Sequence, residues 1–160
     1  MGDLEFKELK HQIGELKIST RGSVVANGYK PDITVVDRDS RLMFILECEE
    51  KTDRKSFLGD VVKAEKYAED CCATPILVIV MKEYDNTTLR QISNHLKPYV
   101  SWLSNIKPRG LNLSQILIIA DLDYELSIEH KEYLGSQEFQ ERSVVVDTSR
   151  PNNLLQETAQ

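Results

Sequence analysis

The chain has 160 residues, of which 41% are hydrophobic and 29% charged, a composition typical of a soluble globular domain with one core. Its net charge of −6 argues against a protein whose whole surface embraces a polyanion, and no apolar run reaches the roughly 18 residues that span a bilayer. Residues 1–120 carry 17 acidic and 17 basic side chains, whereas residues 121–160 carry 9 and 3. The first three quarters of the chain are therefore compatible with a local nucleic-acid surface.

The three cysteines, Cys48, Cys71 and Cys72, are odd in number and form no Cys-x-x-Cys pair. This argues against a disulfide framework and a zinc site, and it indicates a reducing compartment. The first residues do not show the basic region and apolar block of a secretory signal. We therefore expect a cytoplasmic protein with no membrane association.

The first half of the chain predicts one helix followed by three strands. Residues 3–13 have the spacing of a short amphipathic helix, and residues 15–27 favour a bent strand or a hairpin. The apolar runs 31–37 and 41–50 predict two strands joined by a polar turn.

The rest of the chain alternates between helices and strands. A helix over about 56–71 has an apolar face at helical spacing, and residues 76–81 form a continuous apolar run typical of a central strand covered on both faces. The later elements are expected to be a helix over 88–104 that Pro98 kinks or splits, a strand at 116–120, a weak helix over 127–140 and an edge strand at 143–147.

This order predicts an α/β fold with a mixed central β-sheet flanked by helices. We expect residues 1–147 to form one domain and residues 148–160 to form a polar, flexible tail. Tyr99 and Trp102 lie at helical spacing, so we expect them in the core or in an interface rather than as platforms for stacked bases.

Carboxylates stand at the ends of the two apolar runs at 31–37 and 41–50. Asp32 opens the first, and Glu47 and Glu49 close the second on the same strand face as Lys51, because strand side chains alternate. Buried carboxylates are costly unless they are paired or bind a cation, and Mg²⁺ or Mn²⁺ prefers such oxygen ligands. The pattern therefore predicts a site for a hard divalent metal.

A simpler interpretation assigns these acids no chemistry. Asp32, which follows Pro31, would cap a backbone turn at the start of its strand. Glu47, Glu49 and Lys51 would then form the solvated end of the second strand, where acids are common.

Pro31-Asp32, a hairpin, and an acid-x-(Lys or equivalent) tripeptide after an apolar strand resemble the motif of the PD-(D/E)xK nuclease superfamily. The resemblance covers roughly residues 3–81, since the predicted order there is αβββαβ. It implies a restriction-endonuclease-like core with C-terminal additions and Mg²⁺- or Mn²⁺-dependent hydrolysis of DNA, in a restriction, repair or mobile-element system. It also implies that Asp32, Glu47 and Glu49 hold the metal.

The chain departs from that motif because Glu49 stands at the lysine position, as it does in some active members of the superfamily. Two other registers stay open. Glu49-Glu50-Lys51 can serve as the acid-x-Lys element, or the basic role can lie on the next helix at Lys63. Lys63-x-x-x-Tyr67 resembles the Gln-x-x-x-Tyr element of RecB-type exonucleases. Lys51 or Lys63 would then stabilise the charge on the phosphate.

The expected partners are DNA and a second copy of the chain, because cutting both strands of a duplex usually needs two active sites. The competing hypothesis is a catalytically inactive nuclease-fold module for DNA binding or protein interaction. The acidic last quarter and the missing lysine favour this alternative, and the three acids favour the enzyme. The side chains expected to contact nucleic acid are Lys51, Arg54, Lys55, Lys63, Lys66 and Tyr67.

Overall fold

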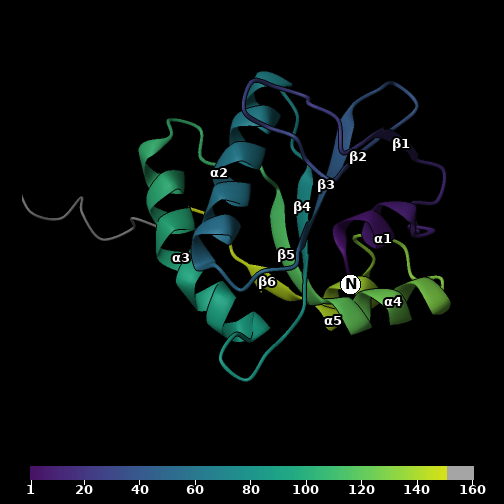
Figure 1. Cartoon of the computed structure of the whole chain (residues 1–160). Coiled ribbons are helices and arrows are strands. Elements are labelled where there is room, and N and C mark those ends of the chain that lie inside the picture. The colour runs from purple at the N-terminus through teal and green to yellow at the C-terminus, as the bar shows by residue number, and fades with distance from the viewer. Residues whose placement is uncertain (151–160) are drawn as a thin grey trace, which may run out of the picture.

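The structure is a computed structural model that describes residues 1–150 (Figure 1). One six-stranded mixed sheet runs through it in the order β1-β2-β3-β4-β5-β6. The strands are β1 (Lys17–Arg21), β2 (Ile33–Val36), β3 (Leu42–Glu49), β4 (Ile76–Met81), β5 (Gln115–Ala120) and β6 (Val144–Val146). The helices are α1 (Asp3–Glu8), α2 (Arg54–Asp70), α3 (Leu89–Ile106), α4 (Asp121–Glu129) and α5 (Gln137–Arg142).

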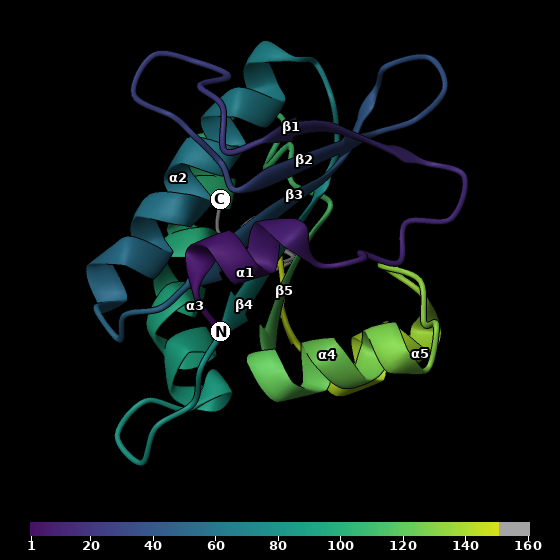
Figure 2. The ribbon, with the colours of Figure 1, turned by 45° about the vertical axis from the view of Figure 1, so that its right-hand side comes forward.

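The type of strand pairing changes twice across the sheet. β1, β2 and β3 pair antiparallel, β3, β4 and β5 pair parallel, and β6 returns antiparallel to β5 at the edge. The helices α2 and α3 cover one face, and α1, α4 and α5 lie on the other (Figures 1 and 2). The predicted α/β class is confirmed, and so is the order of helix, three strands, helix and strand in the first half.

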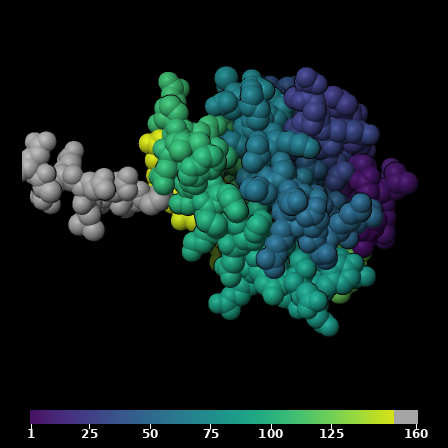
Figure 3. Space-filling model, turned by 60° about the vertical axis from the view of Figure 1, so that its left-hand side comes forward, coloured from purple at the N-terminus to yellow at the C-terminus, as the bar shows by residue number. Residues whose placement is uncertain are grey.

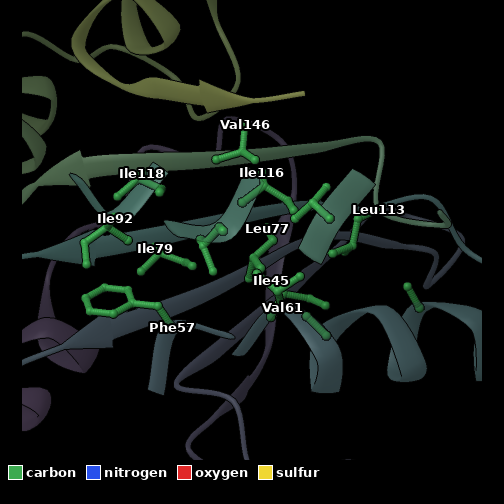
Figure 4. Packing of buried hydrophobic residues seen from close by; sticks show 14 of the residues in the cluster. Ile45, Phe57, Val61, Leu77, Ile79, Ile92, Leu113, Ile116, Ile118 and Val146 are labelled. Carbon is green, nitrogen blue, oxygen red and sulfur yellow. The ribbon is translucent and has the colours of Figure 1, made fainter. Parts of the chain in front are cut away.

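The central strand β4 shows why the sheet is stable. Leu77 and Ile79 face the helices α2 and α3, whereas Val78 and Val80 face the opposite layer, and all four are fully buried. Figure 4 shows Leu77 and Ile79 in one buried cluster with Phe57 and Val61 of α2 and with Ile116 and Ile118 of β5. The predicted burial of this strand on both faces is confirmed. Each buried aliphatic side chain contributes about 1.5–3 kcal/mol to the stability of the fold, so β4 anchors both helical layers.

The first helix is shorter than predicted. It ends at Glu8, and Leu9 already has an extended backbone with φ −61° and ψ 151°. Leu9 and Ile13 still pack against the apolar cluster around Phe6, but from a loop. The backbone of this loop is paired through tertiary contacts: the Leu134 amide donates to the carbonyl of Gln12 at 2.9 Å.

The single helix predicted over 127–140 is wrong. The structure has α4 and α5 in this part, separated by a turn in which Lys131 and Gly135 adopt φ values of 55° and 78°. A side chain at Gly135 would also lie 3.2 Å from the Phe44 ring. Positive φ values end a helix, so the turn divides the segment despite its helical composition.

Pro98 does not split α3, which runs unbroken from Leu89 to Ile106. Of the two places expected for Tyr99 and Trp102, the core is excluded, because they are 46% and 61% exposed. They lie on the outer side of α3, and α2 and α3 form much of the surface in Figure 3. Their alternative role in an interface stays a prediction.

The first residues of the predicted tail are docked on the domain. The Thr148 hydroxyl donates to the Ser114 carbonyl at 3.0 Å, and Arg150 Nε donates to the Ser104 carbonyl at 3.3 Å. The rest of the predicted tail, residues 151–160, lies outside the described residues. In the described part, no helix has both the length and the apolarity to cross a membrane.

A buried carboxylate joins α2 to the loop that leads into β5. Glu65 is 3% exposed, and its two oxygens accept the amide of Asn112 at 2.7 Å and the amide of Leu113 at 2.9 Å. The ammonium of Lys107 also contacts it. These contacts compensate the buried charge of the Glu65 carboxylate, and they hold α2 at a defined position over the sheet.

Replacing Glu65 by Ala is expected to lower the free energy of unfolding by about 3 kcal/mol, because it leaves a cation and two amides without their partner. Glu69→Ala is the matched control: Glu69 also contacts Lys107, at 3.2 Å, but its side chain is 52% exposed, so its loss should cost less than about 1 kcal/mol. Urea unfolding measures both. Equal losses would contradict the role assigned to Glu65.

Candidate functional site

The topology of the sheet brings the predicted acids together. Because β2 runs antiparallel to β3, the start of β2 lies beside the end of β3. Asp32 therefore meets Glu47: the Asp32 amide donates to Glu47 Oε2 at 3.2 Å. Glu49 follows on the same strand, and α2 carries Asp60 over them. The residues around this cavity of about 410 Å³, hereafter the acid hollow, are Asp3, Lys7, Lys30, Asp32, Glu47, Cys48, Glu49, Glu50, Lys51 and Asp60.

The Asp32 carboxylate is held on two sides. Its Oδ2 accepts the Cys48 amide at 2.7 Å, and its Oδ1 lies 3.3 Å from the ammonium of Lys7. Burial, together with a hydrogen bond shared with the carboxyl of Asp3, raises the pKa of Asp32 to about 6. The same shared hydrogen bond, with the help of Lys7, lowers the pKa of Asp3. The two carboxyls therefore behave as a pair that holds one proton more readily than separate aspartates would.

Glu47 is buried between β2 and the loop before it. The hydroxyl of Tyr29 donates to Glu47 Oε1 at 2.7 Å, and Tyr29 is itself buried. Burial raises the pKa of Glu47 to about 7, and the charge on Asp32 adds to this, although the hydrogen bond from Tyr29 acts in the opposite direction. The Glu47 side chain thus has a fixed orientation and holds a proton more readily than an exposed glutamate does.

Asp60 is the acid that the strand pattern did not predict. Its Oδ2 is buried and has no hydrogen-bond partner. Burial, a hydrogen bond shared with Glu49 and the charge on Glu47 raise the pKa of Asp60 to about 10. Four carboxyl groups therefore line one hollow, and burial and mutual repulsion raise the pKa values of Asp32, Glu47 and Asp60 among them.

The six side chains predicted to contact nucleic acid differ in their distance from the acid hollow. Lys51 is exposed and lines the acid hollow. Lys63 is also exposed and lines an adjoining cavity of about 330 Å³, which shares Glu47 and Asp60 with the hollow. The remaining four predicted contacts line neither cavity.

Those four side chains lie elsewhere on α2. Arg54 and Lys55 are exposed at its first turn, and Lys66 pairs with Asp70. Tyr67 packs edge-on against Tyr29 with ring centroids 6.0 Å apart. Their proposed contacts with nucleic acid stay predictions.

The donor chemistry of the hollow fits a hard divalent cation. The candidate ligands are carboxylate oxygens, and Asp60 Oδ2 is a buried oxygen that has no partner. As they stand, however, no three His, Cys, Asp or Glu side chains among residues 1–150 are disposed to hold a metal ion. An ion would therefore have to draw the carboxylates together.

Sequence reasoning missed five members of the site: Asp3, Lys7, Tyr29, Lys30 and Asp60. Asp60 had a signal, because it falls between Phe57 and Val61 on the apolar face of its helix. The others had none, since their roles come from contacts between distant segments. No family model, curated protein or solved structure matches the chain.

The raised pKa of Glu47 predicts a pH-dependent stability in metal-free buffer. Its pKa rises from 4.5 when unfolded to about 7 when folded, so the folded state keeps a proton that the unfolded state releases. The associated stability is fully present below pH 4.5 and is lost as the pH rises through about 7. The free energy of unfolding of the wild type, relative to Glu47→Gln, should fall by roughly 3 kcal/mol over this range.

Urea unfolding of both proteins in EDTA, at intervals from pH 4.5 to 7.5, measures this difference. Buried His11 has its pKa lowered to about 4 and so affects stability in the opposite direction, but it is common to both proteins and cancels. Parallel pH curves for the two proteins would show that Glu47 ionises normally in the folded state.

Proposed function

We propose that this chain is a divalent-metal-dependent nuclease that hydrolyses DNA phosphodiester bonds. The observation that carries the proposal is the gathering of Asp32, Glu47, Glu49 and Asp60 around one hollow at the end of β3. The pKa values of three of them, Asp32, Glu47 and Asp60, are raised, and a protein that only folds has no use for carboxyl groups placed in this way.

The fold supports the same proposal. Its first half has the order α1-β1-β2-β3-α2-β4, with β4 parallel to β3 after the crossover through α2. We assign it to the restriction-endonuclease-like class, with β5, β6 and their helices as C-terminal additions. The three free cysteines fit a reducing compartment, so we assign the protein to the cytoplasm.

Mg²⁺ or Mn²⁺ would be held by Asp32 and Glu47, with Glu49 and Asp60 as further carboxylate donors. When bound, the ion supplies positive charge that offsets charge on the phosphate and favours deprotonation of water. The chain contributes orientation. The Cys48 amide fixes Asp32, and the Tyr29 hydroxyl fixes Glu47, so both carboxylates meet the substrate in set positions.

Cations around the hollow would bind the DNA backbone. Lys30 and Lys51 are exposed at its rim, and Lys63 lies over the adjoining cavity. Phosphate contacts by lysine depend on charge and place the backbone without reading sequence. A homodimer would supply two such sites for the two strands of a duplex.

A second candidate is an inactive nuclease-fold module for DNA binding or protein interaction. It is favoured by the finding that no three acids among residues 1–150 stand ready for a metal, and by the ion pair of Asp32 with Lys7. In that case the hollow would bind no divalent ion. Metal binding therefore separates the two candidates.

Saturating Mn²⁺ is expected to raise the melting temperature of the wild type by about 5–10 °C, because an ion that binds only the folded state stabilises it. Asp32→Asn and Glu47→Gln should each remove most of this shift. Glu129→Gln, at an exposed acid of α4, is the control and should keep it. No shift in the wild type would favour the inactive module. The measurement is a thermal melt with and without Mn²⁺.

Incubation with plasmid DNA and Mg²⁺ tests the reaction itself. The wild type is expected to nick or linearise the plasmid, and Asp32→Asn or Glu47→Gln should lower the rate at least 100-fold, as losses of electrostatic stabilisation commonly do. Agarose gels over time give the rates. Full activity in either variant would contradict the assignment of the site.

A further inference from the structure

Lys7 lies against one of the proposed metal-binding carboxylates. Its Nζ is 2.8 Å from Asp3 Oδ2 and 3.3 Å from Asp32 Oδ1, and its side chain is 16% exposed. It comes from α1, on the opposite face of the sheet from α2. Within residues 1–150 it is the lysine whose ammonium is paired with a carboxylate of the acid hollow.

The turn after β1 leaves space for this ammonium. Gly22 has a φ of 67°, and a Cβ there would lie 2.9 Å from Lys7 Nζ and 3.0 Å from its Cε. The same turn also contacts both segments that the Lys7–Asp32 ion pair joins, α1 and the residues before β2. The Gly22 amide donates to the Asp32 carbonyl at 2.7 Å, and the Arg21 guanidinium donates to the Lys7 carbonyl. The lysine and Asp32 are therefore positioned by one piece of backbone.

The ion pair with Asp3 alone does not account for this arrangement. Asp3 and Lys7 are four residues apart on one helix, and such a pair forms on any exposed helix surface without help from another segment. Here the ammonium instead lines the same hollow as Glu47 and Glu49. A glycine turn from a different part of the sheet also makes room for it. The hollow thus has an internal cation beside its acids.

We propose that Lys7 supplies the positive charge that the nuclease motif would place where Glu49 stands, and that its ammonium contacts a non-bridging oxygen of the bound phosphodiester. This inference rests on the proposed nuclease function. Asp3 is a positioning residue that holds the ammonium at the hollow when no phosphate is present.

The reaction that Lys7 assists is hydrolysis of one P–O bond. The oxygen of a water molecule forms a bond to phosphorus, and the bond from phosphorus to the leaving sugar oxygen breaks. One proton of the water ends on the leaving oxygen and the other goes to solvent, which gives a phosphomonoester and a free hydroxyl. Lys7 keeps its proton throughout and offsets the charge that collects on the phosphate oxygens.

The test compares three variants of the full chain. Lys7→Met removes the charge, Lys7→Arg keeps it in another shape, and Gly22→Ala keeps the lysine but displaces its ammonium. Lys10→Met, at an exposed lysine nearby, is the matched control. Each protein is assayed for plasmid cleavage in Mg²⁺, for binding of a fluorescent duplex oligonucleotide in Ca²⁺, and for the melting-temperature shift caused by Mn²⁺.

Lys7→Met is expected to lower the cleavage rate at least 100-fold and to weaken oligonucleotide binding several-fold, while its Mn²⁺ shift stays as large as in the wild type. Gly22→Ala should lower cleavage about tenfold, and Lys7→Arg should lose less than Lys7→Met. Lys10→Met should match the wild type. A purely structural lysine would instead lower the melting temperature and the Mn²⁺ shift together, which would overturn the inference.

The outcomes also separate this inference from the proposed function. If the wild type cleaves and Lys7→Met cleaves within threefold of it, Lys7 has no such role and the nuclease proposal stands. If the wild type does not cleave but its oligonucleotide binding depends on Lys7, the phosphate contact stands and hydrolysis is wrong. If the wild type neither cleaves nor binds, both are overturned.

Discussion

Crowding of carboxyl groups at the end of β3 is the constraint on which the candidate site depends. Asp32, Glu47 and Asp60 are all at least partly buried, and each raises the cost of ionising its neighbours. The protein tolerates this because backbone amides and the Tyr29 hydroxyl bind two of the acids and Lys7 lies beside one. Such an arrangement has a reason to exist if a cation or a phosphate–cation pair completes it.

The rest of the fold supplies the rigidity that this crowding needs. β4 is buried on both faces, so the sheet cannot shift relative to either helical layer. Glu65 ties α2 to the loop before β5, which holds Asp60 over the strand ends. On the other face, α1 is anchored by the buried ring of Phe6 and carries Lys7 to the same place. The site thus lies where both layers meet one strand end.

The strands and most helices followed from hydrophobic periodicity, which is a local property. The central strand at 76–81 and the placement of Asp32 beside Glu47 were predictable because alternation and antiparallel order dictate them. The division of 127–140 into two helices was not, since it depends on positive φ values at Lys131 and Gly135. The exposure of Trp102 could not be predicted either, because helical spacing does not say which apolar side chains of a helix face the sheet.

The amino-acid sequence by itself determined the α/β class, the order of the first six elements and the three acids just before β2 and at the end of β3, because each depends on residue type and short-range spacing. The tertiary structure decided which residues join those acids. Asp60 comes from α2, Tyr29 from the loop before β2, and Lys7 from α1. They meet because antiparallel pairing and two-sided helix packing bring remote segments to one strand end. No local pattern encodes this arrangement, which also places Lys7 beside Asp32.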